Sequence, residues 1–259
     1  MKTGFFKKSI YCLAVLALLL GAFFTVACHK NNPPENPYAK ENNFAVTVNE
    51  SDGATEYAPE GFTPTYGFVF YAGALIDTDN YAYLGNALAK QGYLTVIYPW
   101  ELSYANYDPN IPTLLKYPKV KFFVGGHDIG GGTAVRHAMD YAKYNYNVAG
   151  LILYAPTNFK KQVFENGELK YDENGNVVWD HYSTAQYDIP TLLIEVDDSL
   201  RTEEMKSETR AHINTQVTTT YTIQNSMSID FSMPSPDDNA NAIRQTVMDY
   251  TMQFMLGLM

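Results

Sequence analysis

From Phe44 onward, short apolar runs alternate with helical patterns along the chain. The runs are rich in β-branched and aromatic residues and are bounded by Gly or Pro, as in "GFVFYAG", "GYLTVIYP" and "IPTLLIEVDD", which is typical of buried strands. The alternation predicts an α/β fold with a mostly parallel central sheet and helices on both faces. The expected strands are Ala45–Val48, Tyr66–Tyr71, Leu94–Tyr98, Lys121–Val124, Ala149–Tyr154, Thr191–Val196 and Thr218–Ile223, and the clearest helices are Asp79–Lys90, Ile129–Tyr144, Thr202–Asn214 and Asp237–Met255.

One stretch, residues 159–188, interrupts this alternation. Two Asn-Gly pairs, Asn166-Gly167 and Asn174-Gly175, lie between short strand-like pieces, a pattern that predicts a hairpin excursion. Because the excursion lies between two sheet strands, it could cover their carboxyl ends, where ligands bind in open α/β sheets. The alternative is a decoration on the surface.

The beginning of the chain predicts export. Lys7 and Lys8 precede an uncharged run over residues 10–27 that ends at Cys28. We expect a signal peptide over residues 1–27, lipidation of Cys28, a Pro/Asn-rich tether over 28–43 and a folded domain over 44–259. The protein would then be held at the cell envelope by a lipid anchor in a bacterial membrane. An uncleaved transmembrane anchor is the alternative, because the run is just long enough to cross a bilayer.

Net charge and motifs restrict the partners. The chain has 18 basic and 28 acidic residues, a net charge of −10, and Lys2, Lys7 and Lys8 fall in the segment expected to be removed. An acidic chain of this kind is a poor partner for nucleic acid, so we expect none. The stretch "GGHDIGGG" lacks the Lys-Ser/Thr ending of a phosphate-binding loop, and no residue spacing favours a metal site, so we expect neither cofactor nor metal.

The stretch Gly126-His127-Asp128-Ile129-Gly130 follows an expected strand and opens an expected helix. This is the setting of a nucleophile elbow, in which the central residue has a positive φ and its neighbours are small enough for strand and helix to approach. Glycines at 125, 126 and 130–132 meet that need. The pattern therefore puts Asp128 at the position of a nucleophile.

Two segments, "GFVFYAGALIDTDNYAYLGNALAKQGYLTVIYPWELSYAN" and "YPKVKFFVGGHDIGGGTAVRHA", resemble the small bacterial α/β hydrolases of the dienelactone-hydrolase-like group, whose elbow reads G-G-H-S-L-G-G. The resemblance covers the chain after Phe44 and implies an α/β-hydrolase fold. It puts Asp128 where the family has its serine, and Asp198, with Asp197 as the alternative, where the family has its triad acid. Ser228, in "TIQNSMSIDFS", stands where the family has its histidine.

The resemblance also implies an oxyanion hole. Its donors would be the backbone N–H groups of Ile129 and of Gly73 or Ala74. Ala74 stands where the family has a glycine. Backbone donors survive such side-chain changes, so we expect the hole to be retained better than the triad.

A serine triad needs a hydroxyl nucleophile and an imidazole base, and the matched positions carry neither. An aspartate can attack carbon to form an ester, but a histidine normally activates the water that hydrolyses this ester. Aspartate also tolerates positive φ and can cap a helix. We therefore expect a catalytically degenerate binding or scaffold protein, in which Asp128 preserves the elbow without its chemistry.

Two alternatives stay open. The first is an active hydrolase of small esters, lactones or related substrates that uses Asp128, Ser228 or Ser103. Its base would be a histidine outside the usual position: His127 is expected to support the elbow, His137 and His212 lie on helices, and His181 could swing over the site from the excursion. The second is an envelope protein whose excursion, residues 159–188, docks a partner.

Overall fold

A computed structural model describes residues 43–51, 53–99, 116–143, 148–232 and 238–259. The expected signal peptide, Cys28, most of the tether and Ser103 lie outside these residues. No helix within them is long and apolar enough to cross a membrane. Export and lipid anchoring therefore stay predictions.

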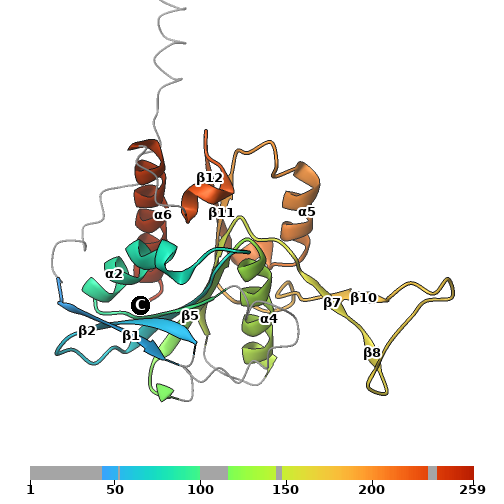
Figure 1. Cartoon of the computed structure of the whole chain (residues 1–259), viewed down its shortest axis with the longest axis horizontal. Helices are drawn as coiled ribbons and strands as arrows, with labels where there is room; N and C mark the ends of the chain where they lie inside the picture. The colour runs from blue at the N-terminus through green and yellow to red at the C-terminus, as the bar shows by residue number, and fades with distance from the viewer. Residues whose placement is uncertain (1–42, 52, 100–115, 144–147, 233–237) are drawn as a thin grey trace, which may run out of the picture. The chain divides into compact units, whose positions relative to one another are not determined.

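The central feature is an eight-stranded sheet (Figure 1) with the strand order β1-β2-β4-β3-β5-β6-β11-β12. β2 pairs antiparallel with β1 and with β4, and the other neighbours pair parallel. The expected mostly parallel sheet is confirmed. The strands are β1 Val46–Ser51, β2 Ala54–Pro59, β3 Tyr66–Tyr71, β4 Leu94–Tyr98, β5 Lys121–His127, β6 Val148–Tyr154, β11 Thr191–Val196 and β12 Thr218–Ile223.

Helices cover both faces of the sheet because successive strand side chains point to opposite sides. In β3, Phe68 and Phe70 pack in one apolar cluster with side chains of α2 and α6, whereas Val69 and Tyr71 pack in a second cluster with side chains of α4. The helices are α2 Ala82–Lys90, α4 Ile129–Lys143, α5 Glu203–Ala211 and α6 Asp238–Gly257, with short 3₁₀ turns η1 Thr78–Tyr81, η3 Thr215–Val217 and η4 Ser228–Phe231. The expected helices are present, with shifted ends. η1 precedes α2, Thr202 caps α5 through a bond from the Met205 amide at 3.3 Å, α5 ends at Ala211 rather than Asn214, and α6 ends at Gly257 rather than Met255. The expected ends at Tyr144 and Asp237 lie outside the described residues.

One strand, β2, escaped the sequence analysis. Its stretch contains Glu56, an acidic residue that is only 6% exposed. The Glu56 carboxylate accepts hydrogen bonds from Lys116 Nζ at 3.0 Å and Tyr117 Oη at 2.7 Å, about sixty residues further along the chain. Burial of a carboxylate needs such partners, and the local sequence around β2 gives no sign of them.

The excursion forms two small antiparallel pairs. β7 (Lys160–Gln162) pairs with β10 (Trp179–His181), and β8 (Phe164–Glu165) pairs with β9 (Glu168–Leu169). Asn166 and Gly167 both have positive φ, 55° and 86°, as a two-residue hairpin turn requires. The expected hairpin excursion is present, and it extends sideways from the sheet (Figure 1). Three of its large side chains are more than half exposed: Phe164, Tyr171 and Trp179.

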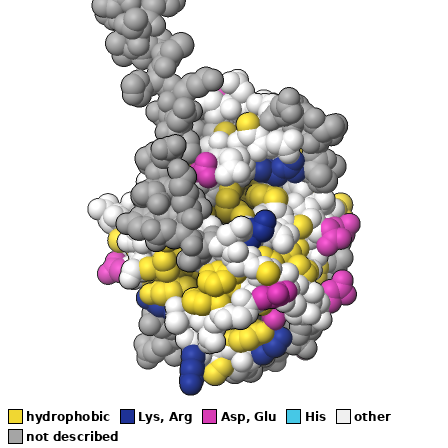
Figure 2. Space-filling model, turned by 90° about the vertical axis from the view of Figure 1, so that its left-hand side faces the viewer, with side chains coloured by type: hydrophobic (Ala, Val, Ile, Leu, Met, Phe, Trp, Pro, Cys, Tyr) yellow, Lys and Arg dark blue, Asp and Glu magenta, His cyan; other side chains and the backbone are white. Residues whose placement is uncertain are grey.

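Figure 2 shows the molecule from the side on which β1 and β2 lie in Figure 1. Hydrophobic side chains form a broad area there, and the basic side chains in view are separated from one another by acidic, polar and hydrophobic groups.

The fold brings several loops to one edge of the sheet. The loops that follow β3, β5, β6, β11 and β12 all leave from the carboxyl ends of parallel strands. The chain order changes direction around β3, which lies between β4 and β5. Ligand sites in open α/β sheets form at such an edge, and the candidate residues lie there.

Candidate functional site

The elbow has the backbone geometry that the sequence predicts. Asp128 follows β5 directly, has a φ of 52° and precedes Ile129, the first residue of α4. A Cβ on Gly126 would clash with the Gly130 carbonyl, and one on Gly130 with the Tyr71 carbonyl. These glycines therefore permit the close crossing of strand and helix.

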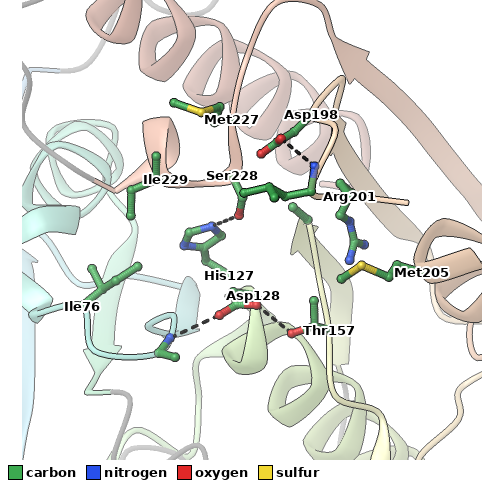
Figure 3. Close-up of a pocket in the computed structure, with 13 residues that line it drawn as sticks. Ile76, His127, Asp128, Thr157, Asp198, Arg201, Met205, Met227, Ser228 and Ile229 are labelled. Atoms are coloured by element: carbon green, nitrogen blue, oxygen red, sulfur yellow. Dashed lines mark hydrogen bonds between the residues drawn. The ribbon is translucent and has the colours of Figure 1, made fainter. Parts of the chain in front are cut away.

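The Asp128 carboxylate lies between two neighbouring loops (Figure 3). Oδ1 accepts a hydrogen bond of 2.7 Å from Thr157 Oγ1, after β6, and Oδ2 accepts one of 3.4 Å from the Ala74 amide, after β3. The Asp128 backbone carbonyl accepts from the amides of Gly131 and Thr157, each at 2.9 Å. We expected the carboxylate to cap the first turn of α4. Its bonds instead go to other loops, and the backbone carbonyl makes the bond to that turn.

The expected oxyanion donors are largely engaged. The Ala74 amide donates to Asp128, and the Gly73 amide donates to Tyr81 Oη at 3.0 Å. The third, Ile129, is half-buried at the start of α4. The Asp128 side chain thus accepts the hydrogen bond of the Ala74 amide, a donor that a reacting carbonyl would need.

His127 places an imidazole in the site, but the ring nitrogens bond groups other than the Asp128 carboxylate. The ring is 1% exposed, and its Nδ1 lies 2.7 Å from Tyr81 Oη while Nε2 lies 2.7 Å from Ser228 Oγ. Burial lowers the pKa of His127 to about 4, although the negative charge of Asp128 partly opposes this effect. The imidazole is therefore neutral near pH 7.

Asp198 and Ser228 lie near Asp128, at the same edge of the sheet. Asp198 follows β11, and its Oδ1 accepts a hydrogen bond of 2.8 Å from the Leu200 amide rather than from an imidazole. Ser228 begins η4 and bonds His127. The fold thus brings the three triad positions together. Asp198 bonds its own loop and takes no part in the hydrogen bonds of Asp128 or Ser228.

These residues line a cavity of about 310 Å³ (Figure 3). Its walls are mostly apolar, from Ala74, Ile76, Ala155, Leu200, Met205, Met227 and Ile229. No residue of 159–188 is among its described lining residues, so the excursion does not cover the strand ends at this cavity. Of the two interpretations of the excursion, surface decoration is the one that this geometry favours, because its chain runs sideways from the sheet.

Arg201 lines the cavity, but its positive charge is paired with Glu195. Its guanidinium is buried and bonds both Glu195 carboxylate oxygens, at 3.0 and 3.1 Å, and also Thr209 Oγ1 at 3.1 Å. Because Glu195 compensates this charge and His127 is neutral, Asp128 and Asp198 set the charge of the cavity. The described lining therefore carries net negative charge.

Comparison with known proteins identifies the family. The model of the alpha/beta hydrolase family matches residues 67–222, more than half of the chain. The chain belongs to this family. A search of curated proteins found no match.

Two solved structures are similar to this chain. A structure described as a predicted CIB-like hydrolase from Thermoplasma acidophilum is similar over 79% of this chain and 97% of its own, at 16% sequence identity and a TM-score of 0.51. A soluble variant of monoglyceride lipase from Saccharomyces cerevisiae, in complex with a substrate analog, is similar over 83% of this chain and 97% of its own, at 11% identity and a TM-score of 0.48. At such low identity the likeness to the first shows the fold alone.

The other described histidines of this α/β hydrolase, His137, His181 and His212, lie away from the cavity. His137 is buried in the core, where its Nδ1 lies 2.5 Å from Tyr71 Oη. His181 does not swing over the site, because its ring stacks on that of His212 with centroids 4.7 Å apart. His127 is the histidine among the described lining residues.

Sequence analysis missed three contributors to the site. Tyr81 holds His127, Thr157 holds Asp128, and Glu195 compensates Arg201. Glu195 did leave a signal, because a charge inside the apolar run "LLIEV" needs a buried partner. Thr157 could have been found from its place just after a parallel strand next to the elbow strand, but Tyr81 left no comparable signal.

Proposed function

We propose that this α/β hydrolase binds a small ligand without turning it over, as an exported and lipid-anchored member of the dienelactone-hydrolase-like group with a degenerate triad. The observation that carries the proposal is the place of the Asp128 carboxylate, which accepts the Ala74 amide and the Thr157 hydroxyl. The carboxylate of Asp128 already occupies the position from which a nucleophile would act, and it accepts from a donor that would stabilise an oxyanion.

The electrostatics of that arrangement oppose acyl transfer. Catalysis by an oxyanion hole needs amide donors directed at the place where negative charge develops. Here the Ala74 amide is directed at a fixed carboxylate, so a developing oxyanion would meet like charge. The repulsion would raise the transition state rather than lower it.

The hydrogen bonds of His127 also favour a structural role. Tyr81 Oη already accepts from the Gly73 amide, so its own proton is available for His127 Nδ1. A neutral imidazole then carries its proton on Nε2 and donates to Ser228 Oγ. In that tautomer His127 has no lone pair facing Ser228 and cannot act as its base.

The cavity favours a ligand with a cationic end and an apolar body. Its walls are aliphatic and thioether side chains, and Asp128 and Asp198 supply the charge. A carboxylate has about four lone-pair sites, of which the Asp128 carboxylate uses two, so acceptor capacity remains for an ammonium group. A volume of about 310 Å³ suits a small molecule.

Isothermal titration with matched ligands tests this function. The probes are a primary alkylammonium ion and the alkyl carboxylate of equal chain length. We expect the ammonium ion to bind and the carboxylate not to, and Asp128→Asn to weaken ammonium binding at least about tenfold. Asp197→Asn, an exposed neighbour outside the described lining, is the matched control and should bind as the parent does. Equal binding of both probes, or an unchanged Asp128→Asn, would refute the ligand class.

The lipid anchor is a separate part of the proposal, and the sequence around Cys28 supports it. A lipidated Cys28 would hold the domain on the flexible tether of residues 28–43. We expect Cys28→Ala to move the protein from the membrane fraction to the soluble fraction. Retention in the membrane fraction would favour the uncleaved helix.

A second candidate function rests on one contact, the 2.7 Å between Ser228 Oγ and His127 Nε2. In the opposite tautomer, with the proton on Nδ1, Ser228 would donate to Nε2 and form a serine–histidine dyad. Such a dyad would act on a small ester or lactone. Turnover that depends on Ser228 would establish it.

A further inference from the structure

Three side chains that can ligate a metal meet outside the cavity. His181 ends β10, Glu208 lies on α5, and His212 caps the end of that helix. One ligand atom from each lies within 4.8 Å of the others, and all three residues are half-buried. We propose that they form a site for a divalent transition-metal ion, with Zn²⁺ as the reference ion. The inference is independent of the proposed function.

The backbone already brings the three residues together. Glu208 and His212 are four residues apart around the end of α5, so they lie on one side of the helix. The Thr184 amide donates to the His212 carbonyl at 2.9 Å, and the Tyr182 amide donates to the Phe159 carbonyl at 2.7 Å. The first bond holds the chain after β10 against the end of α5, and the second joins that chain to Phe159. A metal would bind to positions that the fold has already set.

The two imidazoles lie in contact with each other, beside Phe159. Their ring centroids are 4.7 Å apart with an interplanar angle of 12°, and Phe159 stacks on His212 with centroids 5.2 Å apart. A metal lies in the plane of each imidazole that binds it, so the stacked rings must rotate before both can bind one ion.

The ligand chemistry selects the class of ion. Two imidazoles and one carboxylate suit Zn²⁺ and its transition-metal neighbours, whereas Ca²⁺ and Mg²⁺ prefer oxygen ligands. Zn–N distances are about 2.0–2.1 Å, so binding requires the half-buried side chains to rotate inward. Three protein ligands leave a fourth position of the tetrahedron for water.

Metal binding at this place would join two separate parts of the fold. His181 belongs to the excursion, whereas Glu208 lies on α5 and His212 at its C-cap; α5 also carries the cavity residue Met205. A bound ion would therefore hold the excursion on the body of the domain. This effect gives the site a measurable consequence besides binding.

Titration of the purified protein, prepared without a histidine tag, with Zn²⁺ tests the proposal, and Co²⁺ absorption reports the coordination. We expect one ion per chain with a Kd below about 10 µM, tetrahedral Co²⁺ bands, and at least tenfold weaker binding in His181→Ala and Glu208→Gln. Glu204→Gln, exposed on the same helix, is the matched control and should bind as the parent does. His181→Ala is preferred to a change at His212, which packs on Phe159.

Limited proteolysis supplies the second measurement. Zn²⁺ should slow cleavage within residues 159–188 in the parent protein but not in His181→Ala. The proposal is overturned if no saturable binding occurs below about 1 mM Zn²⁺. It is equally overturned if binding occurs but both ligand variants retain it, since the ion then binds elsewhere.

Discussion

The His127 imidazole and the Ser228 hydroxyl lie 2.7 Å apart, one from the end of β5 and the other from the start of η4. The resemblance implies an imidazole at position 228 and a hydroxyl at position 128. The chain instead has the hydroxyl at 228 and an imidazole one residue before the elbow position. Tyr81 Oη bonds the other ring nitrogen, Nδ1. Both imidazole nitrogens therefore have a hydrogen-bond partner, and neither partner is a carboxylate.

Acid should destabilise the fold through His127. The pKa of this buried histidine is lowered to about 4 from the ordinary 6.5, so the unfolded chain takes up a proton that the folded one does not. The stability that comes from this lowered pKa is complete above pH 6.5 and is lost as pH falls toward 4. The change in the free energy of unfolding is about 3 kcal/mol. Urea unfolding at pH 7, 5.5 and 4.5 measures it. His127→Gln should have a shallower dependence on pH, and an equal slope would argue against the assignment.

Tyr81→Phe should destabilise the protein by about 1–3 kcal/mol, because it leaves the Gly73 amide and His127 Nδ1 without their phenolic partner in a buried place. Tyr171→Phe is the matched control, since that side chain is 56% exposed. Thermal unfolding compares the two. Similar melting temperatures for both variants would show that the Tyr81 hydroxyl contributes little.

Thr157→Val should destabilise the elbow by about 1.5–3 kcal/mol, because it replaces the hydroxyl that donates to Asp128 Oδ1 with a methyl group of similar shape. Thr157→Ser keeps the hydroxyl and should recover most of the loss. Chemical unfolding of the three proteins provides the comparison. If the serine variant is no more stable than the valine variant, the hydrogen bond is not the cause.

Glu195→Gln should be among the most damaging single changes. Glu195 and Arg201 are 2% and 5% exposed, and removal of one charge leaves the other buried without compensation, at a cost of about 3–5 kcal/mol. The matched control is Glu203→Gln, which breaks an exposed ion pair on α5 and should leave the unfolding midpoint unchanged. A mild effect of Glu195→Gln would mean that water reaches Arg201.

Much of the fold could be predicted because the decisive signals are local. Apolar runs bounded by Gly or Pro gave the parallel strands, and the glycines around Asp128 gave the elbow, where φ is 52°. β2 was missed because Glu56 looks like a surface residue until Lys116 and Tyr117 come into contact with it. Pairings over such sequence distances leave no periodic pattern.

The site was harder to predict for the same reason. The sequence placed Asp128, Asp198 and Ser228 at one edge, and all three line the cavity. The sequence gives no sign that the Asp128 carboxylate accepts hydrogen bonds from Ala74 and Thr157, because these bonds join loops after three different strands. His127 was expected to support the elbow, and only the fold shows that Tyr81 and Ser228 hold it.

The central claim is that the cavity binds without catalysing, and hydrolysis of short-chain aryl esters by the purified protein tests it most directly. The rate should equal the buffer background and should be the same in Asp128→Asn and Ser228→Ala. A rate above background that either variant abolishes would contradict the claim, and the variant that abolishes it would identify the nucleophile.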